Sequence, residues 1–371
     1  HANVCLNKSP YESPDLDFDE LANSIIEKLR ITSDLKYSSC KQIVESIVAS
    51  LSIKLPHNDL KTLLCSVQKD VLAVENCYDA RQITRLLDIV SEWCADHQER
   101  NWSLLEDEMQ MIEAILELNS YIDKADPRVS LFAITREDFK ALNDLVNVFN
   151  LEARIKIRVV LLQTIKLCCL LSPKIPRILL TTILPTELVQ NVNTALVKDQ
   201  IDSDIIHLAI DILVFLFCCG ECIPFSLYDV FNIELMKNII ELIEKVRPDH
   251  QLVSKLSNFL ISFNLHQAMS PENIIVDAIC RTSCKNFIGR LLYLVNRGIE
   301  SSASVIYSND LLVVFNIIQR EILNLQPGKT RSLFRDLLRY LVINSDKDFI
   351  RDNNIEINEL INLPCDSETN G

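Results

Sequence analysis

Glycine is the residue that most constrains this chain, because it is almost absent. Only five of the 371 residues are glycine, where average usage would give about 25. Glycine supplies the backbone conformations with positive φ that tight hairpins, Rossmann turns and phosphate-binding loops need. The spacing of the five glycines matches neither the glycine-rich nucleotide-binding motifs nor the nucleophile elbow of hydrolases. They are Gly220, Gly289, Gly298, Gly328 and Gly371. Folds rich in tight turns, and the enzymes that carry these fingerprints, are therefore disfavoured.

Between its ends the sequence follows the period of an α-helix, and strand signals are weak. The clearest run is 201–217, where seven apolar residues recur at helical spacing: Ile205, Leu208, Ala209, Ile212, Leu213, Leu216 and Phe217. This pattern predicts an amphipathic helix with a wide buried face. A second helix is predicted to begin at Thr135, which forms a loose capping box with Asp138. A third is predicted to begin at Ser270, which precedes Pro271.

Prolines punctuate the second half of the chain. They recur roughly every 50 residues, close to the length of armadillo and HEAT units, at Pro173, Pro224, Pro271 and Pro327. Each interval holds two or three helical runs, which in such arrays bury their apolar faces by stacking on neighbours. We therefore predict an all-α, armadillo/HEAT-like helical solenoid over residues 18–363, with flexible tails at 1–17 and 364–371. A compact irregular helical bundle is the alternative.

The charge of the chain is strongly acidic. It carries 37 Lys and Arg against 51 Asp and Glu, a net charge of −14. This balance disfavours binding to nucleic acid or to an anionic membrane surface. The longest stretch without charged residues, 256–271, is shorter than the ~20 apolar residues of a membrane span, so no membrane insertion is expected. The 13 cysteines, several of them in apolar runs, indicate reduced thiols and a cytoplasmic location.

The most enzyme-like motif is the C-x-x-C formed by Cys219 and Cys222. In redox enzymes the attacking cysteine lies at a helix N-terminus, whose partial positive charge lowers the thiol pKa. Here the motif follows the C-terminal end of the helix predicted at 201–217, which favours structural thiols. A thiol oxidoreductase remains an alternative. Cys280 and Cys284 have the spacing of half a zinc site without a pair to complete it. We expect no catalytic residues, no metal and no cofactor.

Two polar stripes indicate partner binding. The first follows one face of the helix predicted from Asn309 and includes Asn316 and Arg320. Such side chains suit capture of a partner's backbone or carboxylates. The second is a positive ridge on this acidic chain, formed by Arg331, Arg335 and Arg339. A merely solvated face is the alternative for both stripes, since Asp336 could pair with one of these arginines.

Six short motifs occur in order within residues 178–340. They are Leu-Pro-Thr-Glu-Leu-Val (184–189), Gly-Glu-Cys-Ile-Pro-Phe (220–225) followed by Tyr228, Asn264-Leu265-His266, Leu-Val-Asn-Arg-Gly (294–298), Tyr-Ser-Asn-Asp-Leu (307–311) and Leu-Gln-Pro-Gly-Lys (325–329). Together they resemble the leucine-rich armadillo region of the WISH/DIP/SPIN family of Arp2/3 complex activators. The chain looks like a small fungal member of the DIP type.

The resemblance implies a function. Members of this family are armadillo proteins without enzymatic activity that bind a long helix of a small structural subunit of the Arp2/3 complex. They activate the complex without a preformed filament, so actin itself is involved indirectly. The linear filaments they generate seed branched networks at cortical endocytic actin patches. By matching position, the partner-facing residues are Asn296, Arg297, Asn309, Asp310 and Arg320. Asp310 is also suited to capping its helix.

The chain also departs from the family pattern. Vertebrate members carry an N-terminal SH3 domain and proline-rich segments, which this sequence does not contain. An acidic tail with a tryptophan, as in WASP-type activators, is not found either, so activation is expected to come from the folded surface. The alternative function is a generic armadillo scaffold that binds a peptide or helix in another cytosolic assembly.

Overall fold

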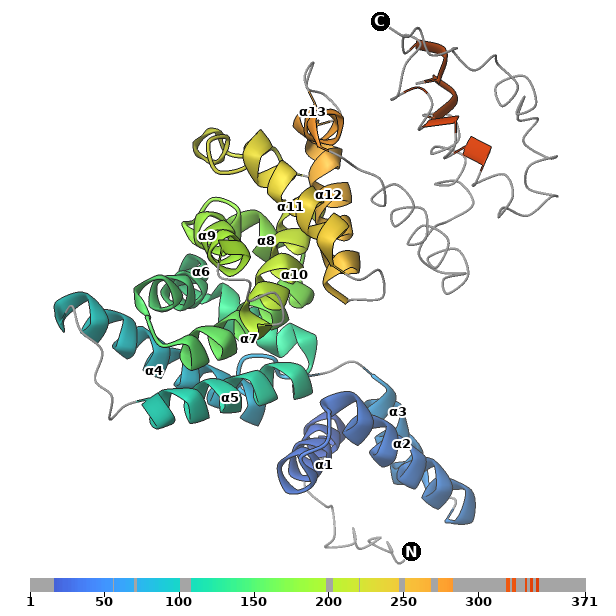
Figure 1. The fold of residues 1–371 in the computed structure, drawn as a ribbon. Helices are drawn as coiled ribbons and strands as arrows, with labels where there is room; N and C mark the ends of the chain where they lie inside the picture. Colours follow the sequence, from blue (N-terminus) through green and yellow to red (C-terminus); the bar gives the residue numbers. More distant parts are fainter. Residues whose placement is uncertain are drawn as a thin grey trace, which may run out of the picture. The chain divides into compact units, whose positions relative to one another are not determined.

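All regular structure in the described part of the chain is helical, which confirms the predicted all-α fold (Figure 1). The computed structural model describes residues 17–55, 57–69, 72–100, 108–197, 203–219, 221–246, 251–267 and 273–282, with short helical fragments between 318 and 339. Within these ranges, no helix is long and apolar enough to cross a bilayer. The flexible tails proposed at 1–17 and 364–371 lie outside them, apart from Asp17, which caps the first helix.

The chain divides into two compact units, residues 1–187 and 188–371. The sequence had suggested one helical domain over 18–363. Helices in a solenoid contact mainly their neighbours and share no central core, so a long stack separates readily into units. The boundary falls within α9 (Leu184–Val197).

The first unit begins with three helices that pack on one another: α1 (Phe18–Ser33), α2 (Tyr37–Lys54) and α3 (Asn58–Gln68). Asp17 caps α1 by accepting hydrogen bonds from the backbone N–H groups of Asp19 and Glu20. The core of this α1–α3 bundle consists of seven buried side chains: Ala22, Ile26, Cys40, Val44, Val48, Leu63 and Val67.

The remaining helices of this unit form a stack in chain order. They are α4 (Tyr78–Arg100), α5 (Glu108–Lys124), α6 (Pro127–Leu151), α7 (Ile155–Leu171) and α8 (Lys174–Leu179). α4 packs on α5 and α6, α5 on α6 and α7, and α6 on α7. Contact of each helix with the next and the next but one is the pattern of a helical solenoid, as the sequence predicted.

α6 breaks in the middle, close to the helix start predicted at Thr135. Arg136 is extended, and Glu137, Asp138 and Phe139 adopt left-handed backbone angles, with φ of 49°, 53° and 62°. The predicted capping role of Thr135 is wrong. Its hydroxyl donates to the carbonyl of Phe132 in the preceding turn, because the helix that begins at Pro127 runs through Thr135 before it breaks.

The second unit contains α10 (Asp204–Cys218), the short 3-10 helix η2 (Phe225–Leu227), α11 (Ile233–Lys245), α12 (Gln251–Gln267) and α13 (Ile274–Arg281). α10 packs on α12, while α11 packs on α12 and α13. The helix start predicted at Ser270 lies outside the described residues, and α13 begins at Ile274.

The predicted amphipathic helix at 201–217 is confirmed as α10. Five of its seven predicted core positions are buried: Ala209, Ile212, Leu213, Leu216 and Phe217. Ile205 and Leu208 are only half-buried, because the buried face is centred nearer Ile206 and Ile210. The ring of Phe217 contacts three other phenylalanines, Phe231, Phe259 and Phe263. This aromatic cluster joins α10 and α12 to the segment before α11.

Candidate functional site

Most residues predicted to face a partner lie outside the described part of the chain. These are Asn296, Arg297, Asn309, Asp310 and Asn316. Arg320, Arg331, Arg335 and Arg339 belong to short helical fragments, and Arg320 and Arg339 are exposed.

Arg335 is only 7% exposed, so it offers little surface to a partner. An i, i+4 row turns about 40° around the helix at each step, and charge spacing alone does not fix which member faces inward. Arg335 is therefore not part of an exposed ridge. For the other residues of the two stripes, partner contact stays a prediction.

The C-x-x-C motif lies at the C-terminal end of a helix, as the sequence indicated. α10 ends at Cys218, and Cys219 is its C-cap. The Cys219 thiol donates to the carbonyl of Leu216 at 2.7 Å, and the Cys218 sulfur lies 3.1 Å from the hydroxyl of Ser262. These contacts suit structural thiols. Gly220, between the two cysteines, and Cys284 of the half zinc site lie outside the described residues. The described ranges contain no group of three or more side chains that could hold a metal ion.

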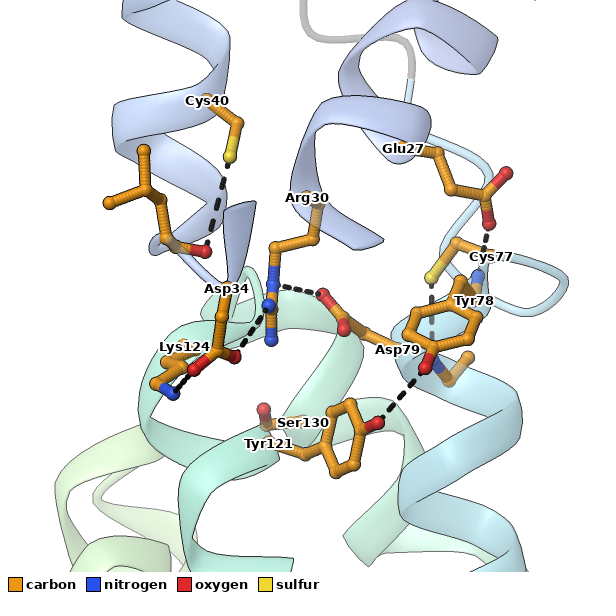
Figure 2. Close-up of polar contacts among 12 residues, drawn as sticks. Glu27, Arg30, Asp34, Cys40, Cys77, Tyr78, Asp79, Tyr121, Lys124 and Ser130 are labelled. Carbon is orange, nitrogen blue, oxygen red and sulfur yellow. Dashed lines mark hydrogen bonds and ion pairs between the residues drawn. The ribbon is translucent and has the colours of Figure 1, made fainter. Parts of the chain in front are cut away.

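A buried polar cluster joins α1 to the beginning of α4. Figure 2 shows Arg30 of α1 pointing between Asp34 and Asp79. The Nε atom of Arg30 lies 3.3 Å from Oδ2 of Asp79, and the two side chains are only 4% and 6% exposed. The guanidinium also lies over the ring of Tyr121 on α5, 5.9 Å from its centroid, where the face of the ring attracts a cation.

Further polar pairs surround this ion pair. Lys124 of α5 donates to Asp34, and Lys36 lies 2.9 Å from Asp123. The carboxylate of Glu27 accepts the backbone N–H of Tyr78. The extensive helix packing described above lies within the α1–α3 bundle or within α4–α8. These polar contacts therefore attach the bundle to the rest of its unit.

The electrostatics of the cluster are those of a structural site. Burial raises the pKa of the Asp79 carboxyl, although Arg30 opposes this effect. The hydrogen bond from Lys124 lowers the pKa of Asp34. Burial and a hydrogen bond to the Tyr78 hydroxyl raise the pKa of Tyr121 to about 12, and burial also raises the pKa of the Cys77 thiol. A tyrosine and a cysteine with raised pKa values stay protonated near neutral pH, so neither is an activated nucleophile.

Two hollows adjoin this region. A cavity of about 100 Å³ lies beside the ion pair, lined in part by Glu27, Arg30 and Asp79. A cavity of this volume has room for a few water molecules, at about 30 Å³ each. A much larger groove of about 640 Å³ runs along α4 and α6, lined in part by Arg85, Asp88 and Arg136. An open groove with charges of both signs can accommodate a peptide or a helix of a partner.

No protein-family model matches the chain. The family resemblance therefore depends on the six ordered motifs alone. Of these, Leu-Pro-Thr-Glu-Leu-Val (184–189) lies in α9 and Asn264-Leu265-His266 lies near the end of α12. The motifs at 294–298, 307–311 and 325–329 lie outside the described residues.

The carboxyl groups around the cluster are expected to titrate in a defined order. The pKa of Asp79 should lie above the ordinary value of 3.8, because the carboxyl is buried. The pKa values of Asp34 and Asp126 should lie below 3.8, because Lys124 donates a hydrogen bond to the first and Arg128 to the second. Titration of the carboxyl carbon resonances by NMR measures all three, and the Asp79→Asn variant assigns the Asp79 signal. A midpoint for Asp79 at or below 3.8 would contradict the burial argument.

The consequences for stability have opposite signs. The stabilisation from Asp34 and Asp126 is present above the unfolded-state pKa and is lost as the pH falls through their lowered folded-state values. For Asp79 the protonated form favours folding, and that contribution is lost as the pH rises through its raised folded-state pKa. Acid therefore weakens the first two contributions while it relieves the cost of burying an ionised Asp79.

Proposed function

We propose that this protein is a non-enzymatic actin nucleation-promoting factor that binds and activates the Arp2/3 complex without a preformed filament. The observation that supports the proposal is the set of six short motifs in residues 178–340. These motifs occur in the same order as in the armadillo region of the WISH/DIP/SPIN family, which they resemble. The all-α, solenoid-like stack of helices supports it, since such stacks present extended surfaces for partners.

In this proposal the protein acts in the cytoplasm at cortical endocytic actin patches. Its partner is a long helix in a small structural subunit of the Arp2/3 complex, contacted by the exposed side chain of Arg320 and by the asparagines of the same stripe. The linear filaments produced seed branched networks. Actin takes part only through the complex.

A generic scaffold function is the second candidate, and the groove along α4 and α6 favours it. This groove belongs to the first unit, whereas the motifs belong to residues 178–340. A peptide or helix from an unrelated cytosolic assembly could occupy it. Charge reversal of Arg136 in the groove should then abolish partner binding, whereas reversal of Arg320 should leave it unchanged.

Single-filament imaging tests the proposed function directly. In this assay actin is polymerised in the presence of the Arp2/3 complex and this protein, without WASP-type activators or preformed filaments. We expect linear filaments to appear only when both the complex and the protein are present. Filament numbers that stay at the level of actin alone, with a folded helical protein, would exclude the nucleation function. An unbiased partner pull-down would then be the next step.

The Arg320→Glu variant is expected to weaken binding to the Arp2/3 complex by at least ~2 kcal/mol, about 30-fold, as loss of a central arginine anchor does. A fluorescence titration of labelled complex measures the affinity, and circular dichroism checks folding. Arg281→Glu is the matched control, because Arg281 is exposed and its reversal changes the net charge equally. Equal affinities for Arg320→Glu and the unmodified protein would remove Arg320 from the interface.

A further inference from the structure

Two aromatic side chains lie together on the surface of the second unit. Among the described residues, only Phe225 and Tyr228 are aromatic and exposed, at 90% and 56%. Their rings contact each other, with centroids 5.7 Å apart and planes tilted by 59°. The two residues are three positions apart at the 3-10 helix η2, where side chains at i and i+3 lie above one another. We call them the aromatic pair.

The turn that carries the aromatic pair is anchored in the core. Leu227 and Phe231 are buried, and the backbone N–H of Phe231 donates to the carbonyl of Leu227 at 2.9 Å. The ring of Phe231 contacts those of Phe217 and Phe263 in the aromatic cluster described above. The turn is therefore held in place before any partner binds, which lowers the entropy cost of binding.

The sequence around the aromatic pair is acidic. Residues 199–236 form the longest stretch of the chain without Lys or Arg, and they contain seven Asp and Glu. Three of these acids lie within six residues of the pair: Glu221, Asp229 and Glu234. Lys237, the next basic residue along the chain, already forms an ion pair with Glu234 at 3.0 Å. The local charge therefore favours a cationic partner.

The aromatic pair and Asp229 attract the same kind of group. Asp229 follows Tyr228 directly and is exposed, and its carboxylate has no ion pair or hydrogen bond within the described part of the chain. The face of an aromatic ring attracts a cation, and so does a carboxylate. Arginine suits both, because its planar guanidinium stacks on rings and donates to a carboxylate through two N–H groups.

We propose that the aromatic pair and Asp229 bind an arginine in a basic segment of a partner protein. The inference does not depend on the proposed actin function. Exposed aromatic rings and arginines are enriched where protein surfaces meet. A nucleic acid is disfavoured as the occupant, because the acids of residues 199–236 repel phosphate groups. A second copy of this chain is disfavoured by its net charge of −14.

Fluorescence anisotropy of labelled synthetic peptides tests the proposal with the full chain, without actin or the Arp2/3 complex. The probes are peptides built from repeats of Arg-Leu-Gly, Lys-Leu-Gly or Glu-Leu-Gly. We expect the arginine peptide to bind, the lysine peptide to bind at least about threefold more weakly, and the glutamate peptide not to bind. An arginine peptide that does not bind at millimolar concentration, or a lysine peptide that binds equally well, would overturn the proposal.

Variants show whether the peptide binds at the aromatic pair. Phe225→Leu combined with Tyr228→Leu keeps apolar side chains but removes both rings, and should weaken binding at least about fivefold. Phe225→Tyr combined with Tyr228→Phe should recover the affinity, because both rings are kept. Circular dichroism checks that each variant is folded. Unchanged binding in the double leucine variant would overturn the proposal.

The carboxylate is tested against an equal loss of charge elsewhere. Asp229→Asn should weaken binding of the arginine peptide at least about threefold. Asp59→Asn is the matched control, since Asp59 is an exposed acid of the first unit, and it should bind normally. Equal weakening by both variants would show that only the overall charge matters and would overturn the proposal. So would dimers of the unmodified chain in sedimentation velocity that the double leucine variant loses, because a second copy would then cover the pair.

Discussion

The Phe217→Ala variant is expected to lose about 3–5 kcal/mol of stability in the second unit. Phe217 is fully buried, and its ring centroid lies 4.9 Å from those of Phe231 and Phe263 and 5.9 Å from that of Phe259. Removing the ring leaves a cavity and breaks three edge-on aromatic contacts, each worth about 0.5–1.5 kcal/mol beyond its buried area.

Native-state hydrogen exchange of amides in α10 and α12 measures this loss. Tryptophan fluorescence would not report on the second unit, because both tryptophans of the chain, Trp93 and Trp102, belong to the first. Phe225→Ala is the matched control, because Phe225 lies in the same unit and is 90% exposed. It should change stability by less than about 0.5 kcal/mol. Similar protection in the two variants would show that the aromatic cluster is not the core of this unit.

The Arg30→Met variant is expected to destabilise the first unit by about 3 kcal/mol at neutral pH. The change leaves Asp79 buried without its counter-charge, which is far more costly than losing an exposed ion pair. The loss should shrink in mild acid, because burial already raises the pKa of Asp79 and protonation removes the uncompensated charge.

Urea denaturation followed by tryptophan fluorescence reports this change, since Trp93 lies in α4, the helix to which the bundle is attached. The double variant Arg30→Met with Asp79→Leu should recover most of the lost stability, because an apolar pair replaces the buried charges. Lys36→Met is the control, since Lys36 and Asp123 are half-exposed and such pairs contribute about 0–1 kcal/mol. A loss in Arg30→Met no larger than in Lys36→Met would contradict the buried-charge argument.

The sequence predicted the elements whose pattern is local. The apolar residues of α10 recur at helical spacing, and their burial follows from that spacing. The position of the C-x-x-C motif after this helix was predictable for the same reason. The helix start predicted at Thr135 lies within a few residues of the break in α6, but the break itself was not predicted. Its left-handed conformation was not predicted, because Glu137, Asp138 and Phe139 include no glycine to signal it.

The polar cluster could not be predicted, because its members come from different helices. Arg30 resembles any charged residue of an amphipathic helix, and Asp79 resembles a favourable acid in the first turn of α4. Only tertiary packing brings them together. The burial of Arg335 was missed for a related reason, since regular charge spacing says nothing about what covers a side chain.

The neighbour-to-neighbour packing of the helices has a consequence for how the chain folds. Extensive contacts such as those of α4 with α6 and of α5 with α7 join helices no more than two places apart along the chain, and folding rates rise as the sequence separation of contacts falls. The α1–α3 bundle has its own core, so it can form while the later helices are still being synthesised. The order of the helices along the chain is then also the order in which they can acquire structure on the ribosome.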